Sequence, residues 1–555
     1  MSNSLIVLFI VFLSFIPCTS LKILVYSPAY GPSHTNFMAR LADTLTEAGH
    51  NVTFFTPIMD ESRRNQLGVK LTKDVIKLEQ DETMKKRKVT IDNVMSLFWT
   101  MDVTSENGHR CLETIHQQAV LTCDNMFRNK ELIEKLRSKD YDVGLAEPLM
   151  TCGLALFRHL GIDKVVLTNS CVNYDVMIPA TGEPEDTSYL PCMFSLKISL
   201  KFGKKFPAMN SQVTDKMTFA ERLENYNLFY LMYDTFGKMF DDETKMYRSH
   251  LGEEFPNWRE LVADASLHFI NAIPSIDFPR PSLQKTIAIG GISIDVEQID
   301  AIENTEDSEF SEILDRRPKN MLISFGTLAR SSDMPEDFKN NLIQVFKSEP
   351  NCTFIWKYET DDVSFADGVD NVVFVKWLPQ KALLKDKRMT AFLTHGGLGS
   401  TTEAAFLAIP TIMFPIFADQ SRNSNMLGRH GMSIVLHKRD LGNFQKLRNS
   451  FHEVLNNEKY RLNAKKVSEM VRNQPLNPKE LVVKYIEFVG KYGPFPHMSP
   501  YSLKMPYYQR YNYDIYAFKT GLFLVPILLI CIVFKLVISY FPVTIVSKDT
   551  KGKME

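Results

Sequence analysis

MTAFLTHGGLGSTTEAAFLA, residues 389–408, is the stretch of the sequence that most clearly predicts the fold. The apolar run at its start is typical of a buried strand, the glycines after it of a tight turn, and the remaining residues of a helix. A turn of this kind presents free backbone amides at the helix N-terminus, where a phosphate can bind. The stretch therefore indicates a phosphate site at the carboxyl edge of a parallel sheet.

The spacing within this stretch excludes two common phosphate-binding motifs. Gly397 and Gly399 lack a third glycine at position 402, so the dinucleotide fingerprint is absent, and no Gly-Lys pair forms a P-loop. Ser400 and Glu403 also have the spacing of a capping box. From the residues alone, a structural and a functional role for Glu403 are equally open.

The predicted strands on either side of this stretch end in residues that suit a nucleotide sugar. Trp377 and Gln380 follow the preceding strand, and an indole ring at a strand end can stack on a base. Asp419 and Gln420 follow the next strand, and an acid–amide pair can hydrogen-bond sugar hydroxyls. We therefore expect a stacking ring, a phosphate site and a polyol site at three consecutive strand ends.

An earlier series of strands and helices opens the chain. LKILVYS at 21–27, a helical pattern over 37–45 and NVTFFTP at 51–57 predict a βαβ unit. Further buried strands are predicted at 141–148 and 163–170, with the apolar run CGLALFRHLG as the helix between them. The fold class is therefore expected to be α/β, with two doubly wound parallel sheets that face a cleft.

Composition divides the body of the chain. The segment 278–292 is rich in proline and glycine and is predicted to be the linker. It separates an N-terminal domain, 21–277, from a C-terminal domain, 293–512, which includes the last helices before the apolar segment.

The two ends of the chain predict a membrane topology. An apolar run followed by small residues predicts a cleaved signal peptide over 1–20. TGLFLVPILLICIVFKLVISYF, residues 520–541, is long enough to span a bilayer once, and the basic tail 542–555 would face the cytosol. Lys551 and Lys553 resemble a dilysine retrieval signal. We therefore expect a type I protein of the endoplasmic reticulum membrane with its body in the lumen.

The overall composition limits the kinds of partner that we expect for this chain. With 64 basic and 65 acidic residues the net charge is −1, which does not favour a nucleic-acid partner. Six cysteines fall in the predicted luminal part without metal-ligand spacing, and their pairing is open. Asn51 and Asn351 open glycosylation sequons, and the second, in a predicted loop, is the better candidate. Association of several copies of the chain is also left open.

Two residues of the N-terminal domain are candidates for acid–base chemistry. His34 lies between the first predicted strand and its helix, where the helix N-terminus disfavours the imidazolium and keeps a histidine neutral. A neutral histidine can accept a proton from a hydroxyl group. Glu147 ends a strand of the same predicted sheet, so its carboxylate could orient His34. Taken alone, His34 could merely cap the helix, and Glu147 could be a solvated or helix-capping residue.

Two stretches together resemble the signature of the UDP-glycosyltransferases. They are WLPQKALL at 377–384 and FLTHGGLGSTTEAAFLAIPTIMFPIFADQ at 392–420. The predicted signal peptide, the His34 loop, SFGTLARSSDMP at 324–335 and the C-terminal span follow in the same order. Over nearly its whole length the chain therefore resembles the membrane-bound UDP-glucuronosyltransferase branch. The resemblance implies a GT-B fold, with the acceptor bound by the N-terminal domain and the UDP-sugar by the C-terminal domain.

The resemblance also implies a role for each candidate residue and no metal or cofactor, the UDP-sugar being a co-substrate. It implies that His34 is the base for inverting attack by a small lipophilic acceptor. It also implies that Trp377 and Gln380 contact uracil, and that His395, Ser400 and the amides of Gly397 and Gly399 contact the diphosphate. Glu403 would contact the ribose, and Asp419 and Gln420 the sugar. The sequence departs from the family pattern twice. Glu147 stands where the family usually has aspartate, and Gly399 where it often has asparagine.

Other functions remain to be weighed against glycosyl transfer. A catalytically silent membrane protein that binds a UDP-sugar would carry the same signature, whereas an adhesion or receptor protein would not be expected to carry it. The donor sugar, glucuronate or glucose, is also open. Glucuronate needs a cationic partner for its carboxylate, and Arg422 and Arg330 are candidates.

Overall fold

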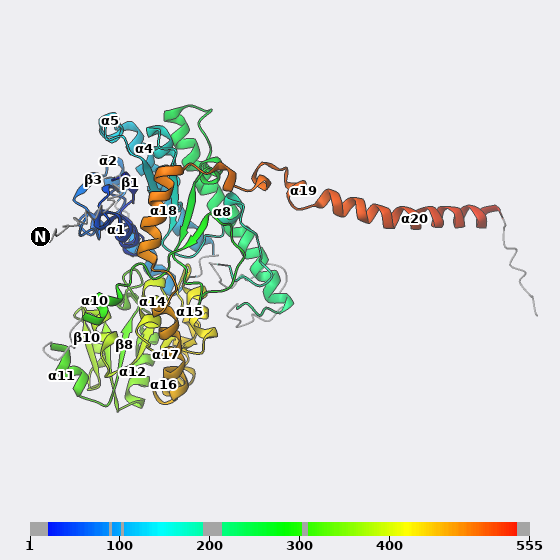
Figure 1. Ribbon diagram of the computed structural model, residues 1–555. Coiled ribbons are helices and arrows are strands. Elements are labelled where there is room, and N and C mark those ends of the chain that lie inside the picture. The colour runs from blue at the N-terminus through cyan, green and yellow to red at the C-terminus, as the bar shows by residue number, and fades with distance from the viewer. Residues whose placement is uncertain (1–19, 88–90, 102–104, 193–213, 302–308, 541–555) are drawn as a thin grey trace, which may run out of the picture. The chain divides into compact units, whose positions relative to one another are not determined.

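Two parallel β-sheets organise the protein (Figure 1). A computed structural model describes residues 20–87, 91–101, 105–192, 214–301 and 309–540. Most of the predicted signal peptide and the whole predicted cytosolic tail, 542–555, lie outside these ranges. Residues up to Ser499 form one compact unit, and those from Pro500 form a second.

The first sheet has seven strands in the order β3-β2-β1-β4-β5-β6-β7, all paired in parallel. Its strands are β1 (Lys22–Tyr26), β2 (Asn51–Pro57), β3 (Asp74–Leu78), β4 (Val143–Ala146), β5 (Val165–Asn169), β6 (Leu267–Ile270) and β7 (Thr286–Ala288). The second sheet has six parallel strands in the order β10-β9-β8-β11-β12-β13. They are β8 (Lys319–Ser324), β9 (Cys352–Lys357), β10 (Val372–Val375), β11 (Met389–Thr394), β12 (Thr411–Met413) and β13 (Ser433–Val435).

Alternation along the central strands explains why helices cover both faces of each sheet. In β1, Leu24 and Tyr26 join one buried cluster while Ile23 and Val25 join another. Side chains of successive strand residues point to opposite faces, so a strand that is apolar throughout must be covered on both sides. The predicted doubly wound arrangement of both sheets is therefore confirmed. We call each sheet with its covering helices the first lobe and the second lobe.

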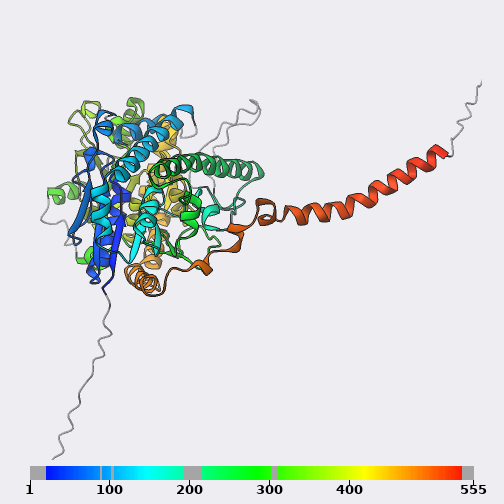
Figure 2. The same ribbon diagram turned by 90° about the horizontal axis from the view of Figure 1, so that it is seen from above.

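The first lobe carries α1 (Pro32–Glu47), α2 (Glu82–Arg87), α3 (Ile91–Ser96), α4 (Glu106–Arg128), α5 (Lys130–Arg137), α6 (Cys152–Leu160), α7 (Met177–Thr181), α8 (Phe219–Leu251) and α9 (Trp258–Ala263). The second carries α10 (Val296–Ala301), α11 (Glu309–Asp315), α12 (Glu336–Ser348), α13 (Gln380–Lys385), α14 (Leu398–Phe406), α15 (Gln420–Arg429), α16 (Phe444–Asn456) and α17 (Glu458–Arg472). Figure 2 shows α8 as one long green helix. A disulfide joins Cys123 of α4 to Cys152 of α6, a pairing the sequence left open.

Two predicted domain boundaries are corrected by the structure. The predicted linker, 278–292, contains β7, which pairs in parallel with β6 and extends the first sheet. Helix α18 (Pro478–Tyr492), predicted within the C-terminal domain 293–512, instead packs against α1 and β4 of the first lobe (Figure 1). Its apolar stripe, Val482, Ile486 and Val489, is buried there, and periodicity alone does not tell a helix which lobe it will cover.

The unit from Pro500 onward contains α19 (Tyr507–Arg510) and α20 (Tyr513–Tyr540). The most apolar 18-residue window of helix α20 has a mean hydropathy of 2.9, and the helix is long and apolar enough to cross a membrane. It begins at Tyr513, ahead of the predicted span 520–541. Pro526 lies inside the helix, as membrane helices tolerate.

Candidate active site

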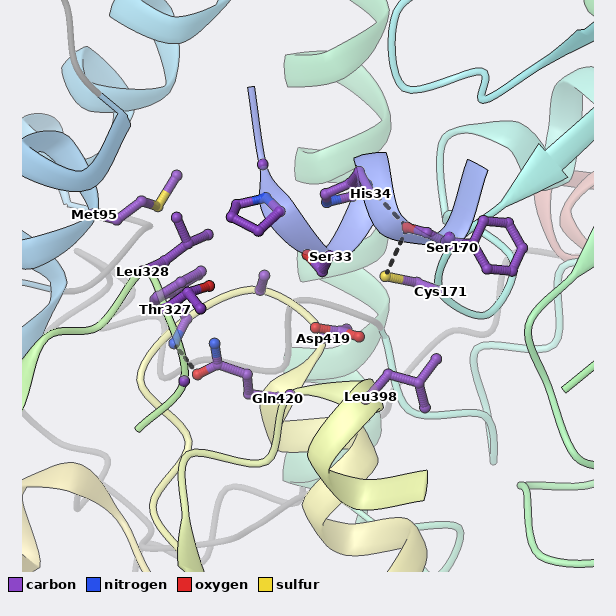
Figure 3. Close-up of a pocket in the computed structure, with 18 of the residues that line it drawn as sticks. Ser33, His34, Met95, Ser170, Cys171, Thr327, Leu328, Leu398, Asp419 and Gln420 are labelled. Atoms are coloured by element: carbon purple, nitrogen blue, oxygen red, sulfur yellow. Dashed lines mark hydrogen bonds between the residues drawn. The ribbon is translucent and has the colours of Figure 1, made fainter. Parts of the chain in front are cut away.

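A cavity of about 670 Å³ lies between the two lobes, at the carboxyl ends of their strands (Figure 3). Ligands of doubly wound sheets bind at this edge. Every predicted site residue lines the cavity except Glu147, which lies directly behind His34. Residues predicted from distant parts of the sequence are therefore brought together in one place.

His34 and Glu147 form a buried pair on the first-lobe side of the cavity. His34 is the third residue of α1, and Glu147 directly follows β4, so adjacent parallel strands deliver both to one edge. Nδ1 of His34 lies 2.8 Å from Oε2 of Glu147. No described residue hydrogen-bonds Nε2 of His34, and the side chain keeps 19% of its surface exposed. The longer side chain of glutamate thus reaches the imidazole at normal hydrogen-bond distance.

Two further residues, Ser170 and Tyr174, hold Glu147 in place. Oε1 accepts hydrogen bonds from the backbone amide of Ser170 at 2.8 Å and from the Tyr174 hydroxyl at 2.6 Å. The Tyr30 hydroxyl lies 3.5 Å from Oε2, and the Ser170 hydroxyl lies 2.9 Å from Nδ1 of His34 (Figure 3). Sequence reasoning missed these residues, although Ser170 could have been found because it ends the predicted strand 163–170.

The charge distribution around this pair corrects one expectation. Burial lowers the pKa of His34, but the Glu147 carboxylate and, less strongly, Asp419 raise it more, so its pKa is above the usual value. Burial raises the pKa of Glu147, but the opposing effect of His34, Tyr174 and Ser170 is larger. The pKa of Glu147 is therefore below its usual value. The carboxylate, and not the N-terminus of α1, therefore determines the protonation of His34, because ion pairing in a buried site is stronger than the field of a helix end.

The glycine turn on the second-lobe side leads directly into α14. Gly397 is the N-cap residue, without a side-chain cap, and Leu398 begins the helix. The capping-box interpretation of Ser400 and Glu403 is therefore wrong, because both residues lie inside the helix. Instead, Oε2 of Glu403 accepts a hydrogen bond of 2.6 Å from Nε2 of Gln380, which also lies 3.2 Å from the Ser400 hydroxyl. Glu403 thus lines the cavity, as the functional interpretation requires.

Close packing against the His395 ring explains why residue 397 is a glycine. A Cβ atom at Gly397 would lie 2.6 Å from the His395 ring, so only glycine fits there. Burial, reinforced by Lys357, lowers the pKa of His395 to about 4, which keeps the imidazole neutral. A Cβ atom at Gly399 would meet nothing within 4 Å, so crowding does not explain why asparagine is missing at that position.

Trp377, Asp419 and Gln420 complete the second-lobe wall. Trp377 is 74% exposed, so a large aromatic face is open to a ligand. Oε1 of Gln420 accepts hydrogen bonds from the backbone amides of Ile416 and Phe417, at 2.8 and 3.0 Å, so its amide nitrogen remains available as a donor. The buried Asp419 carboxylate accepts a 2.7 Å bond from Asn423.

Ala418, beside Asp419, adopts a φ of +53° and lines the cavity. A non-glycine residue in the left-handed region is strained, and such strain gathers at ligand sites. No pattern in the sequence signals it.

The two arginine candidates for a glucuronate carboxylate do not line this cavity. Nη2 of Arg422 lies 2.6 Å from Oδ1 of Asp277, and both side chains are almost fully buried. Arg330 pairs with Asp333 at 2.8 Å. Both guanidinium groups are therefore engaged with carboxylates of the protein itself.

Comparison with known proteins points to one family. A family model described as UDP-glucoronosyl and UDP-glucosyl transferase matches residues 21–551. The Caenorhabditis elegans relative ugt-55 is 29% identical over 478 residues, covering 85% of this chain and 87% of its own length. UDP-glucuronosyltransferase 1-2 of Mus musculus is 26% identical over 409 residues, with coverages of 74% and 72%.

Solved structures agree on the fold. A UDP-glucosyltransferase from Polygonum tinctorium, capable of glucosylating indoxyl, superimposes with a TM-score of 0.57 at 14% identity, covering 85% of this chain and 99% of its own. UGT2 of Phytolacca americana, solved with UDP-2-fluoroglucose and pterostilbene, has a TM-score of 0.55 with the same coverages and identity. The expected GT-B fold is therefore confirmed.

Proposed function

The chain belongs to the UDP-glucuronosyl and UDP-glucosyl transferase family, and from that premise we propose that it is an inverting hexosyltransferase acting on small lipophilic hydroxyl compounds. The observation that carries this proposal is the His34–Glu147 pair. His34 lines one wall of the cavity with Glu147 directly behind it, and the N-terminus of α14 lines the opposite wall. A base and its orienting carboxylate opposite a phosphate-binding helix end are the parts that hydroxyl attack on a UDP-sugar requires.

The proposed reaction takes place in one displacement. Nε2 of His34 takes the acceptor's hydroxyl proton while the acceptor oxygen bonds to the anomeric carbon. The bond from that carbon to the diphosphate oxygen breaks on the opposite face, so the configuration inverts. Glu147 stabilises the imidazolium that forms, and UDP leaves as an anion near the N-terminal amides of α14.

The donor-side contacts of this proposal are those implied by the family resemblance. Trp377 would stack on uracil beside Gln380, Glu403 would bind the ribose, and the region of His395 and Ser400 would hold the diphosphate. Asp419 and the amide nitrogen of Gln420 would bind the transferred sugar.

We infer that the donor is UDP-glucose. A glucuronate carboxylate brought into a buried site needs a cation. The cationic side chains among the described residues that line the cavity are Lys357 and Lys381, apart from histidines. Lys357 is paired with Glu359 at 2.9 Å, and Lys381 lies 3.9 Å from Glu403, on the proposed ribose side. An uncharged hexose therefore suits the remaining wall better.

We also propose that α20 anchors the protein as a single-pass type I protein of the endoplasmic reticulum membrane. The length and hydropathy of α20 support the span, and the lysines of the tail support the orientation. Asn51, at the start of β2, and Asn351, in the turn before β9, are both exposed, as glycosylation in the lumen would require.

Transfer from radiolabelled UDP-sugars tests the proposal directly. Full-length protein in detergent is incubated with UDP-glucose or UDP-glucuronate and a panel of phenols, and labelled products are separated. We expect glucosides with several phenols and stronger protection against thermal unfolding by UDP-glucose. Transfer only from UDP-glucuronate would overturn the donor assignment, and no transfer from any UDP-sugar would favour the silent binding protein.

A further inference from the structure

Among the described residues, the wall that the first-lobe helices α3, α4 and α8 give to one end of the cavity is apolar except for two side chains. This wall comes from α3, the 3-10 helix Leu97–Trp99 that follows it, α4 and α8. The apolar residues are Met95, Phe98, Leu112, Ile115, Ala119, Phe236, Met239 and Phe240. Among them stand one imidazole, His116 of α4, and one carboxyl group, Glu243 of α8. An apolar pocket with few polar groups uses those groups to orient its ligand.

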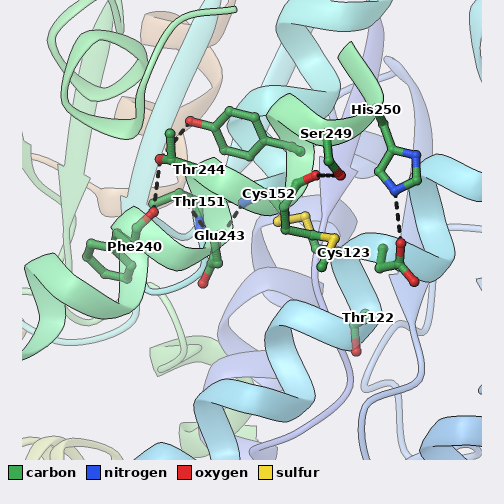
Figure 4. Close-up of a disulfide and its surroundings, with 12 residues drawn as sticks. Thr122, Cys123, Thr151, Cys152, Phe240, Glu243, Thr244, Ser249 and His250 are labelled. Atoms are coloured by element: carbon green, nitrogen blue, oxygen red, sulfur yellow. Dashed lines mark hydrogen bonds and ion pairs between the residues drawn. A yellow bond between two sulfur atoms is a disulfide. The ribbon is translucent and has the colours of Figure 1, made fainter. Parts of the chain in front are cut away.

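One oxygen of Glu243 has a structural role. Oε2 accepts hydrogen bonds from the Thr151 amide at 2.6 Å, the Thr151 hydroxyl at 2.8 Å and the Cys152 amide at 3.1 Å (Figure 4). It thereby satisfies the first amides of α6, at the point where the Cys123–Cys152 disulfide ties α6 to α4. A helix cap needs only one such oxygen, and an amide oxygen would serve equally.

The second oxygen of Glu243 has no such partner. Within the described part of the chain, no donor hydrogen-bonds Oε1, and no lysine or arginine pairs with this carboxyl group. The residue is 1% exposed, and a buried carboxylate without a counter-ion is costly. Burial accordingly raises the pKa of Glu243 to about 7, although the Thr151 and Cys152 hydrogen bonds lower it.

His116 does not neutralise this carboxyl group. Burial lowers its pKa despite Asp242 and Glu113, so the imidazole is uncharged at neutral pH. Its Nε2 is buried, has no hydrogen-bond partner among the described residues and lies 3.9 Å from Oδ2 of Asp242. In the part of the chain that the structure describes, the apolar end of the cavity therefore offers an acidic group and no cation to meet it.

We propose that the acceptor carries a basic amine at the end opposite its reacting hydroxyl, and that Glu243 binds the ammonium group. This inference rests on the proposed function, because it needs an acceptor whose hydroxyl lies at His34. An ammonium group would supply both the missing hydrogen-bond donor and the missing counter-ion, while the apolar wall would cover the carbon chain.

Phenols with matched tails test the proposal. One series ends in a primary amine on alkyl chains of increasing length, and a second has the same chains ending in a methyl group. At one chain length we expect kcat/KM to be about tenfold or more higher for the amine, as a charge-assisted hydrogen bond in a buried site provides. Acetylation of the amine should remove the preference in the unaltered enzyme, a comparison that needs no variant.

Two variants test whether Glu243 causes the preference for amine-ended phenols. Glu243→Gln keeps an oxygen to cap α6 but loses the charge, so the ratio of kcat/KM for amine-ended over methyl-ended phenols should fall to within about twofold of unity. Asp234→Asn is the matched control, because Asp234 is an exposed carboxylate on the same helix and does not line the cavity. It should keep the preference.

The outcomes separate this proposal from the proposed function. If neither series is glycosylated from any UDP-sugar, the proposed function itself fails. If methyl-ended phenols are good acceptors but amines show no advantage at any length, or keep their advantage in Glu243→Gln, the role of Glu243 is overturned.

Discussion

The two walls of the cavity are built in different ways. The second-lobe wall takes its proposed donor contacts from one continuous segment, Trp377 to Gln420. The first-lobe wall is assembled from α1, the ends of β4 and β5, and helices α3, α4 and α8. His34 and Glu147, in direct contact, are 113 positions apart in the sequence.

This difference teaches where the chemistry and the selectivity of the site reside. A strand, a glycine turn and a helix fix the second-lobe contacts locally, so a short motif can specify a site for one constant ligand, the nucleotide. The first-lobe contacts exist only when distant elements pack together, so their identity can vary with the acceptor while the fold persists. Four substitutions test this division, beginning with the largest expected effect.

Replacing His34 with alanine should most clearly separate catalysis, which we assign to the first-lobe wall, from UDP binding, which we assign to the second-lobe wall. Loss of a general base is expected to lower kcat about 10²- to 10⁴-fold. UDP affinity, measured by isothermal titration calorimetry, should stay within about twofold, because the proposed UDP contacts all lie on the other wall. Full activity in His34→Ala would refute the base assignment, and loss of UDP binding would refute the division.

Glu147→Gln should lower kcat by about a hundredfold, because the imidazolium loses its stabilising charge. The pH profile should move as well. The Glu147 carboxylate raises the pKa of His34 against the lowering effect of burial, so its removal lets that pKa fall. A base acts when neutral, and the acid limb of kcat/KM should therefore shift to lower pH.

Glu147→Asp is the control for this experiment, since it retains a carboxylate and should leave the acid limb near its original position. An unmoved acid limb in Glu147→Gln would show that another group controls the titration of the base.

Trp377→Ala should weaken UDP binding about tenfold to a hundredfold, the usual cost of losing one base-stacking ring. The melting temperature should change little, because the ring is 74% exposed and contributes little to the core. Lys376→Ala, at the adjacent exposed residue, should bind UDP normally. Unchanged affinity in Trp377→Ala would place uracil elsewhere on the second-lobe wall.

Tyr174→Phe should have the smallest effect, a fall in kcat of roughly three- to tenfold, because one hydrogen bond to Glu147 is lost while the Ser170 amide remains. Tyr30→Phe is matched to it. Its hydroxyl lies 3.5 Å from Glu147, at the limit of a hydrogen bond, so kcat should change less than twofold. Equal effects of the two substitutions would contradict the supporting role of Tyr174.

Periodicity predicted the central elements of both sheets. β1, α1 and β2 fall where the apolar patterns of the first residues indicate, and β11 and α14 fall on either side of the glycine turn. Patterns failed where an element is short or its partner distant. β7 has three residues, too few for a period, and α18 returns to the first lobe from a position after the second.

The candidate site divides in the same way. Each second-lobe residue could be named from the sequence, since its place follows from the strand or turn immediately before it. Tyr174 and Glu243 could not be named, because their relevance depends on what they contact across the fold. The pKa of His34 belongs to this second group, since a carboxylate from another strand sets it.

The sequence by itself thus determined the family, the two parallel sheets and the residues proposed for the nucleotide side of the site, because bond geometry along a short segment is enough to form a strand, a turn and a helix end. Only the tertiary structure decided how Glu147 is held against His34, where α18 packs, and that a carboxyl group lies in the apolar end of the cavity. Those features depend on side chains from distant segments meeting in a buried volume, where distance and desolvation govern hydrogen bonding and charge.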